Sequence, residues 1–174
     1  VTIYKIELII NCAAYTNVND AETNKRQAIK VNLDAVRNLV EVCEEKKIKM
    51  IHFSTDYVYN SDNLNPINED SNIDPLNYYG ISKREGEKII EKSSSRSIIL
   101  RTSWLYSNYG NNFVKTMIKK GENEETVYVI NDQFGCPTYS KDLVTCVLDI
   151  LSSNKLYKKK VYNFSNEGFT NWYD

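Results

Sequence analysis

Three short segments of this chain are almost continuously apolar: residues 7–13 (ELIINCA), 48–54 (IKMIHFS) and 97–103 (SIILRTS). Runs of this length and composition are typical of strands that are buried on both faces of a sheet. The segment between residues 60 and 76 carries two prolines among many Asn, Asp and Ser residues, which predicts a loop. We therefore predict three buried strands, with the loop following the second of them.

Helical spacing of apolar residues follows the first predicted strand. The apolar stripe recurs at intervals of three and four residues, at Ala28, Val31, Ala35 and Leu39. Asn19 with Glu22 three residues later resembles a capping box, so we predict that this helix starts near Asp20. Similar patterns predict helices over residues 78–95 and 111–120, a strand over 125–131, and a helix over 140–153 capped by Ser140.

This alternation of strands and helices favours an α/β fold with a mostly parallel, doubly wound sheet of the Rossmann-like kind. Such sheets bind ligands at the carboxyl ends of their strands. Ala13 and Ala14, Thr55, and Thr102 with Ser103 all directly follow predicted strands. Their shared position at strand ends is the first indication of a functional site.

The composition narrows the class of protein. The 174 residues are 41% hydrophobic and 26% charged, with a net charge of −1, which predicts neither a nucleic-acid surface nor a polybasic membrane patch. No apolar run approaches the ~20 residues of a membrane helix, and we expect no signal peptide at the start. The four cysteines form no C-x-x-C pair, so we expect reduced thiols in the cytoplasm and no zinc site. The single histidine, His52, lies in an apolar run and is interpreted as a structural strand residue.

The strongest candidate chemistry lies in Thr55, Tyr79 and Lys83. Residues four apart share one face of a helix, so the Tyr79 phenol and the Lys83 amine should point the same way. A tyrosine has an unperturbed pKa of about 10, and a nearby ammonium group lowers that pKa. The pair would then donate a proton to a carbonyl oxygen that gains negative charge, while the Thr55 hydroxyl orients that oxygen. This arrangement suits hydride transfer to or from a sugar or alcohol carbon.

Longer motifs are more specific than Y-x-x-x-K alone. They are NCAAYTNVNDAE, KVNLDAVRNLVEVC, STDYVY, DPLNYYGISKREGE, RTSWLY, NNFVKTM and DQFGCPTYSKDL, and they run through nearly the whole chain. In this order they resemble the extended short-chain dehydrogenase/reductase family, and within it the reductases of 4-keto-6-deoxy sugar nucleotides. The resemblance implies NADPH-dependent reduction of the 4-keto group of dTDP-4-dehydro-L-rhamnose to dTDP-L-rhamnose, with NADH as a possible second donor.

The resemblance also assigns roles to residues. It implies that Tyr79 is the proton donor, that Lys83 is its partner and binds the nicotinamide ribose, and that Thr55 completes the triad and contacts substrate. The cofactor would also contact the turn formed by Ala13, Ala14, Tyr15 and Thr16.

Positions that line the sugar-nucleotide pocket in that family match Val18, Asp56 and Trp104, beside Thr55. The indole of Trp104 would cover one face of a sugar ring. Asn32, in KVNLDA, is expected to bond backbone near the site and is interpreted as structural.

The chain departs from the family pattern in its glycines. The family opens with a Gly-rich turn that cradles the cofactor pyrophosphate, but the first glycine here is Gly80. We therefore expect a fragment that lacks the N-terminal Gly-rich segment and the C-terminal end. Residues 1–105 would be the remainder of a dinucleotide-binding domain, and residues 106–174 a partial substrate-binding region interleaved with its last elements.

Two other functions stay open. One is a sugar-nucleotide epimerase or dehydratase of the same superfamily, although a dehydratase would be expected to carry an acidic pair after the threonine, where this chain has only Asp56. The other is a non-catalytic relative resembling the regulatory subunit of methionine adenosyltransferase. The resemblance is also compatible with a homodimer that holds magnesium at its interface.

Overall fold

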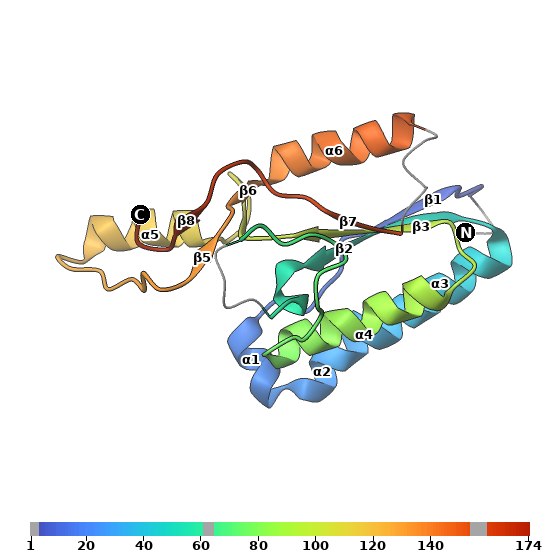
Figure 1. The fold of residues 1–174 in the computed structure, drawn as a ribbon, viewed down its shortest axis with the longest axis horizontal. Coiled ribbons are helices and arrows are strands. Elements are labelled where there is room, and N and C mark those ends of the chain that lie inside the picture. The colour runs from blue at the N-terminus through green and yellow to red at the C-terminus, as the bar shows by residue number, and fades with distance from the viewer. Residues whose placement is uncertain (1–3, 61–64, 154–159) are drawn as a thin grey trace. The chain divides into compact units, whose positions relative to one another are not determined.

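The structure, a computed structural model, describes residues 4–60, 65–153 and 160–174 (Figure 1). The chain divides into two compact units. The first unit comprises Val1–Arg101 and Lys155–Asn163, and the second comprises Thr102–Asn154 and Phe164–Asp174.

The first unit contains a four-stranded sheet with the order β1-β2-β3-β7. These strands are β1 (Leu8–Asn11), β2 (Lys49–Thr55), β3 (Ser97–Thr102) and β7 (Val161–Asn163). The pairs β1–β2 and β3–β7 are parallel, and Asn11 lies opposite His52 in the register of the first pair. The predicted α/β fold with parallel strands is thus confirmed, and each of the three apolar runs contains one strand.

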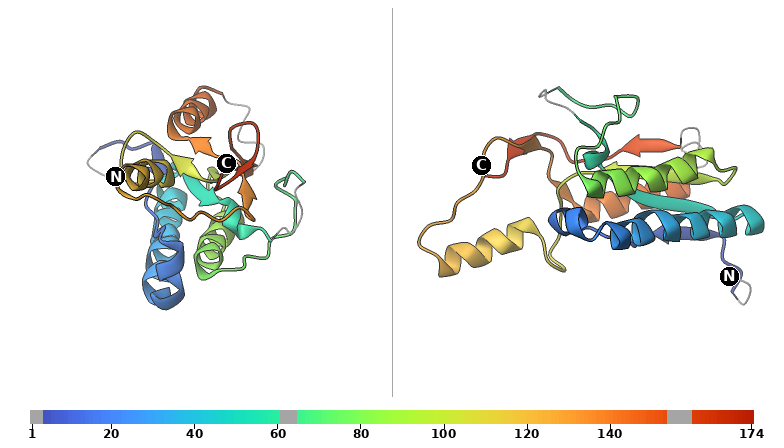
Figure 2. Two further views of the ribbon diagram at one scale, coloured as in Figure 1. Left: turned by 90° about the vertical axis from the view of Figure 1, so that its left-hand side faces the viewer. Right: turned by 90° about the horizontal axis from the view of Figure 1, so that it is seen from below.

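The longest helices of the first unit pack against this sheet. After β1 come α1 (Val18–Thr23), α2 (Lys25–Ile29), the π-helix η1 (Lys30–Asp34) and α3 (Ala35–Lys46), and after the loop comes α4 (Tyr78–Lys92). Both Figure 1 and the right-hand view of Figure 2 show α3 and α4 side by side along the strands. Their apolar stripes meet the sheet in one core: Val36, Val40, Cys43, Ile48, Met50, Ile90 and Ile99.

A buried ion pair ties α4 to β3. Glu87 of α4 is fully buried, and its two carboxylate oxygens accept from Nε and Nη2 of Arg101 at 2.9 and 2.7 Å. Arg101 also donates to the Tyr59 hydroxyl at 2.6 Å, and Arg84 donates to Glu87 at 2.9 Å. Both side chains of this ion pair, which we call the Glu87–Arg101 fork, are removed from water. The fork therefore stabilises the fold only while both partners and their hydrogen bonds are present.

Among its described residues, the second unit has two small sheets and two helices. In its sheets β4 (Leu105–Tyr106) pairs parallel with β6 (Thr138–Tyr139), and β5 (Phe134–Gly135) pairs antiparallel with β8 (Thr170–Asn171). Its helices are α5 (Phe113–Asn123) and α6 (Ser140–Ser152).

Three local predictions are wrong. Helix α1 is capped by Asn17 and begins at Val18, while the Glu22 carboxylate accepts from the Tyr78 backbone N–H at 2.7 Å instead of closing a capping box. Ser140 is the first residue of α6 and makes no side-chain cap, because Tyr139 occupies the cap position. Residues 125–131 form no strand; Tyr128 in their middle is 94% exposed, and a strand without a neighbour leaves its backbone groups unpaired.

Candidate active site

Thr55 ends β2 and shapes the turn that follows it. It is 5% exposed and caps the short 3₁₀-helix η2 (Asp56–Val58), with its Oγ1 accepting from the Tyr57 N–H at 3.2 Å. The Thr55 hydroxyl donates to Oδ1 of Asp56 at 3.1 Å. The strand end that the sequence singled out is therefore a buried polar turn.

Helix α4 begins directly beside this turn. The side chain of Asn77 caps the helix by accepting from the Gly80 N–H at 2.8 Å. An ideal Cβ on Gly80 would stand 2.2 Å from the Tyr57 carbonyl oxygen, so only glycine lets the helix approach so closely. This approach sets Tyr79 against the turn, with its ring edge-on to Tyr57 at 5.8 Å between centroids.

Tyr79 and Lys83 are directed toward the same strand. The Tyr79 phenol lies beside the Thr55 side chain at the end of β2. Lys83 is 2% exposed, and its amine donates to the Phe53 carbonyl oxygen of β2 at 2.6 Å and lies 3.3 Å from His52 Nε2. Both side chains thus lie on the β2-facing side of α4, as the i,i+4 spacing predicted.

The pKa of Tyr79 is raised to about 12, whereas we expected a lowered value. Burial is the main cause, since it disfavours the phenolate. The neighbouring Thr55 side chain opposes the rise, whereas the nearby Asp56 and Tyr57 add to it. Burial lowers the pKa of Lys83 to about 8, opposed by the negative charge of Glu87. The Lys83 amine contacts the Phe53 carbonyl oxygen and Nε2 of His52, and it is not among the groups that shift the pKa of Tyr79.

Asp56 is perturbed as well. Burial raises its pKa to about 6, while hydrogen bonds from Thr55 and from the backbone N–H groups of Asp56 and Tyr57 oppose the shift. A carboxyl group with this pKa changes charge near neutral pH. It lies next to the hydroxyl group that contacts Tyr79.

The expected cofactor turn is held to α4 by Asn32. In the π-helix, Asn32 accepts from the Tyr15 N–H at 2.8 Å and donates to the Tyr15 carbonyl at 3.0 Å and to Ser82 Oγ at 2.9 Å. Ser82 in turn donates to the Tyr79 carbonyl at 2.7 Å. Asn32 therefore bonds backbone near the site, and it fixes the turn relative to the helix that carries Tyr79 and Lys83.

The predicted cofactor and substrate positions differ in exposure. Ala13 and Thr16 are exposed, whereas Ala14, Tyr15 and Val18 are half-buried. The first unit thus brings together Thr55, Asp56, Tyr79 and Lys83, and its next neighbours along the β1 side are the turn of Ala13–Thr16 and the start of α1. The contact of His52 with Lys83 was not predicted, because its place in an apolar run indicated only a structural strand residue.

Trp104 lies in the second unit, in its own aromatic cluster. Its indole stacks on Trp172 with 3.7 Å between centroids, and Phe113 meets Trp172 edge-on at 4.4 Å. Trp104 adopts a left-handed backbone with φ of 45°, and a Cβ on Gly135 would stand 2.5 Å from its Cε2. Its orientation is thus fixed within the second unit by Trp172 and by the lack of a side chain at Gly135.

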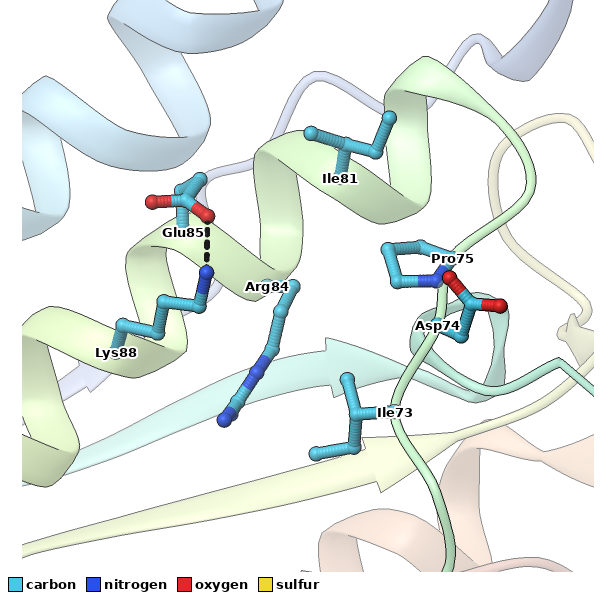
Figure 3. Close-up of a pocket in the computed structure, with 7 residues that line it drawn as sticks. All are labelled: Ile73, Asp74, Pro75, Ile81, Arg84, Glu85 and Lys88. Carbon is cyan, nitrogen blue, oxygen red and sulfur yellow. Dashed lines mark hydrogen bonds and ion pairs between the residues drawn. The ribbon is translucent and has the colours of Figure 1, made fainter.

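A hollow of about 380 Å³ lies elsewhere, between α4 and the preceding loop (Figure 3). It is lined by Ile73, Asp74, Pro75, Ile81, Arg84, Glu85 and Lys88. Its charges are paired: Lys88 with Glu85 at 2.5 Å, Arg84 with Glu87 and Glu91, and Asp74 with the Asn60 amide. None of the candidate catalytic residues lines it, and we do not assign it a role in the chemistry.

Within residues 4–60, 65–153 and 160–174, no group of three or more His, Cys, Asp or Glu side chains could hold a metal ion. This geometry gives no support for the magnesium that the resemblance placed at a dimer interface. The same described part of the chain contains no helix both long and apolar enough to cross a bilayer.

Known proteins match this chain over nearly its whole length. Residues 1–174 match the family described as "RmlD substrate binding domain". The chain is similar to dTDP-4-dehydrorhamnose reductase of Aggregatibacter actinomycetemcomitans, with 40% identity over 174 residues, covering 98% of this chain and 59% of that protein. It is also similar to the spore coat polysaccharide biosynthesis protein SpsK of Bacillus subtilis, with 37% identity over 173 residues, covering 98% and 59%.

Among solved structures, the fold is similar to dTDP-4-dehydrorhamnose reductase from Bacillus anthracis in complex with NADP. The TM-score is 0.93 at 38% identity, covering 99% of this chain and 61% of that chain. The chain thus spans about 59% of the length of the curated relatives it matches.

Proposed function

Because the chain belongs to the RmlD substrate binding domain family, we propose that it is the catalytic part of an NADPH-dependent sugar-nucleotide reductase. The proposed reaction reduces the 4-keto group of dTDP-4-dehydro-L-rhamnose and yields dTDP-L-rhamnose, a precursor of cell-surface polysaccharides. The similar proteins that carry a reductase name, and the similar structure in complex with NADP, support this choice of reaction and cofactor. The reducing cytoplasm, where unpaired thiols persist, is the proposed location.

The observation that carries the proposal is the convergence of three groups on the end of β2. The Thr55 hydroxyl and the Tyr79 phenol meet there, and the Lys83 amine approaches the same strand one helical turn further along α4. Tyrosine and lysine so placed suit proton transfer to a carbonyl oxygen, with the lysine able to act on the charge of the phenol.

When bound, NADPH supplies the hydride for C4 of the sugar. The Tyr79 hydroxyl gives its proton to the O4 oxygen as negative charge develops there, and the Thr55 hydroxyl holds that oxygen by a hydrogen bond. A Tyr79 pKa of about 12 keeps the phenol protonated before the reaction. Lys83, with a pKa of about 8, changes charge close to neutral pH, and its ammonium form would favour the phenolate that remains.

We further propose roles for the surrounding residues. The first unit would be the remainder of the dinucleotide-binding domain, with the cofactor at Tyr79, Lys83 and the turn of Ala13, Ala14, Tyr15 and Thr16. The second unit would be part of the substrate-binding region, with Trp104 against the sugar. Val18 and Asp56 would contact the sugar nucleotide from the first unit. The exposed turn and the phenol fit the nicotinamide end of the cofactor, whereas no Gly-rich cradle for its pyrophosphate precedes Gly80.

The test is NADPH oxidation by the complete protein with a dTDP-4-keto-6-deoxy sugar as substrate. Tyr79→Phe should retain the fold and lower turnover by at least ~100-fold, with NADPH affinity changed much less. Tyr78→Phe is the matched control, because Tyr78 lies one residue earlier in the same helical turn and its ring faces Lys25 at 5.0 Å. Near-normal turnover in Tyr79→Phe would show that Tyr79 is not the acid. Absence of reduction in the unmodified protein would favour an epimerase or a non-catalytic relative.

A further inference from the structure

A chain of buried polar groups connects the turn after β1 with Lys83. The Ala13 N–H donates to Oδ1 of Asn11 at 3.2 Å, and the Asn11 amide nitrogen lies 2.9 Å from Nδ1 of His52. On the other side of the same ring, His52 Nε2 lies 3.3 Å from the Lys83 amine. Asn11, His52 and Lys83 are all buried, so these groups must find their partners within the chain.

The direction of each hydrogen bond follows from the first one. A backbone N–H can only donate, so the Asn11 oxygen must face Ala13 and the Asn11 NH₂ group must face His52. The Nδ1 atom of His52 then has to accept, which leaves the ring proton of a neutral imidazole on Nε2. Burial lowers the pKa of His52 well below its ordinary value, and the charge of Lys83 lowers it further, so the ring is neutral.

The consequence falls on Lys83. An ammonium group has three donors and no acceptor, so it cannot accept the Nε2–H of His52. A neutral amine can accept that hydrogen with its lone pair and still donate to the Phe53 carbonyl at 2.6 Å. The arrangement of Ala13, Asn11 and His52 therefore satisfies every hydrogen bond only when Lys83 has released its proton.

We propose that His52 is a positioning residue for Lys83, which presents an N–H toward the lysine amine and so eases the loss of its proton. Asn11 and the Ala13 N–H set this tautomer from the neighbouring strand β1. The proposal rests on the proposed function only in giving Lys83 a role in catalysis; the arrangement of protons can be measured without turnover.

The charged groups around Lys83 agree with this reading. Glu87, one turn further along α4, raises the pKa of Lys83, but its carboxylate is engaged by Arg101 and Arg84. From β2 the facing titratable group is His52, and Asp56 in η2 acts on Tyr79. On the strand side, the tautomer of His52 thus determines whether the Lys83 amine faces a hydrogen-bond donor or an acceptor.

The link has a consequence for the cofactor turn. Ala13 is the first residue of the turn proposed to contact the cofactor, and its N–H is the donor that orients Asn11. A displacement of this N–H would let the Asn11 amide rotate and turn its oxygen toward Nδ1 of His52. The ring proton of His52 would then move from Nε2 to Nδ1. The protonation of Lys83 would then respond to the conformation of the turn.

The first test is the tautomer itself. The protein is prepared without a histidine tag and labelled with ¹⁵N in its imidazole rings, and the His52 signals are those that His52→Gln removes. We expect Nε2 to carry the proton and Nδ1 to be unprotonated near neutral pH. Protonation on Nδ1, or on both ring nitrogens, would overturn the proposal. Asn11→Asp places an acceptor on both sides of its carboxylate and should exchange the two ring-nitrogen states.

The second test is the titration of Lys83, followed by the ¹³C shift of its ε-carbon and by the pH dependence of kcat in the complete protein. In His52→Gln the side-chain amide can turn its oxygen to the ammonium group, so the Lys83 titration should move upward by about one pH unit or more. The high-pH limb of kcat should move with it. A variant with a uniformly lower kcat and an unmoved Lys83 titration would show that His52 only supports the fold. If the complete protein shows no reductase activity, the ε-carbon titration still decides the matter.

Discussion

The buried ion pair between Glu87 and Arg101 leads to a prediction about the free energy of unfolding. Glu87→Gln keeps the size and helix propensity of the side chain but removes the charge that faces Arg101. The guanidinium then stays buried, with 2% of its side chain exposed, opposite a neutral amide. Breaking one partner of a buried pair costs about 3–5 kcal/mol, because the other charge is left without compensation. For a chain of this size that corresponds to a fall in Tm of about 6–20 °C.

Glu85→Gln is the matched control for this experiment. Glu85 lies two residues earlier on α4 and pairs with Lys88, but their side chains are 39% and 45% exposed. Exposed pairs contribute about 0–1 kcal/mol, so this variant should unfold within a few degrees of the unmodified chain. The same substitution on the same helix thus separates burial from charge.

Unfolding is best followed by far-ultraviolet circular dichroism together with tryptophan fluorescence. The helices of both units contribute to the first signal, with the larger share from the first unit, whereas both tryptophans, Trp104 and Trp172, lie in the second unit. The dichroism transition of Glu87→Gln should move to lower temperature, and the fluorescence tells whether the second unit follows it. Equal melting temperatures for Glu87→Gln and Glu85→Gln would refute the reasoning.

The pH dependence of this effect has a definite sign. Burial works against the ionised Glu87, but the hydrogen bond and charge of Arg101 outweigh it and lower the pKa of Glu87. A carboxyl group with a lowered folded-state pKa stabilises the fold above its unfolded pKa, and this stabilisation is lost as the pH falls through the folded pKa. The difference between the unmodified chain and Glu87→Gln should therefore shrink in acid.

Three further outcomes are expected. Gly80→Ala should destabilise the first unit by about 1–3 kcal/mol in a denaturation assay, because its Cβ would stand 2.2 Å from the Tyr57 carbonyl oxygen. In the same assay Gly121→Ala should be neutral or stabilising, because a Cβ there would have no other atom within 4 Å. Asp56→Asn should raise the free energy of unfolding at pH 7 by about 1–3 kcal/mol, since the pKa of Asp56 rises to about 6 on folding. The gain should vanish below pH ~4, where the Asp56 carboxyl group is protonated and as neutral as the asparagine. A gain that persists there would contradict the raised pKa of Asp56. The 174-residue chain should bind NADPH roughly 10²–10⁶-fold more weakly than a protein with a Gly-rich phosphate turn, and a micromolar dissociation constant by calorimetry would show that a phosphate site has been overlooked.

Much of the fold and part of the candidate site follow from local patterns in the sequence. Continuous apolar runs of β-prone residues are typical of strands in a covered parallel sheet, so the existence of β1, β2 and β3 was predictable. The predicted burial holds for β2 and β3 but is wrong for β1, where Ile10 is 42% exposed. The period of the α-helix places Tyr79 and Lys83 on one face whatever surrounds them. The position of Thr55 at the end of an apolar run likewise follows from the sequence alone, whereas its burial does not.

Only the tertiary structure decided the properties that depend on distant residues. The Glu22 carboxylate serves the N-terminus of α4 instead of its own helix, because Tyr78 lies beside it in the fold. The contact between His52 and Lys83 joins residues from a strand and a helix that the sequence separates by a loop. The pKa of Tyr79 rises although a lysine follows one turn later, since desolvation depends on how many atoms pack around the phenol. Periodicity determines which face a side chain occupies, whereas its partners and its charge are determined by what packs against that face.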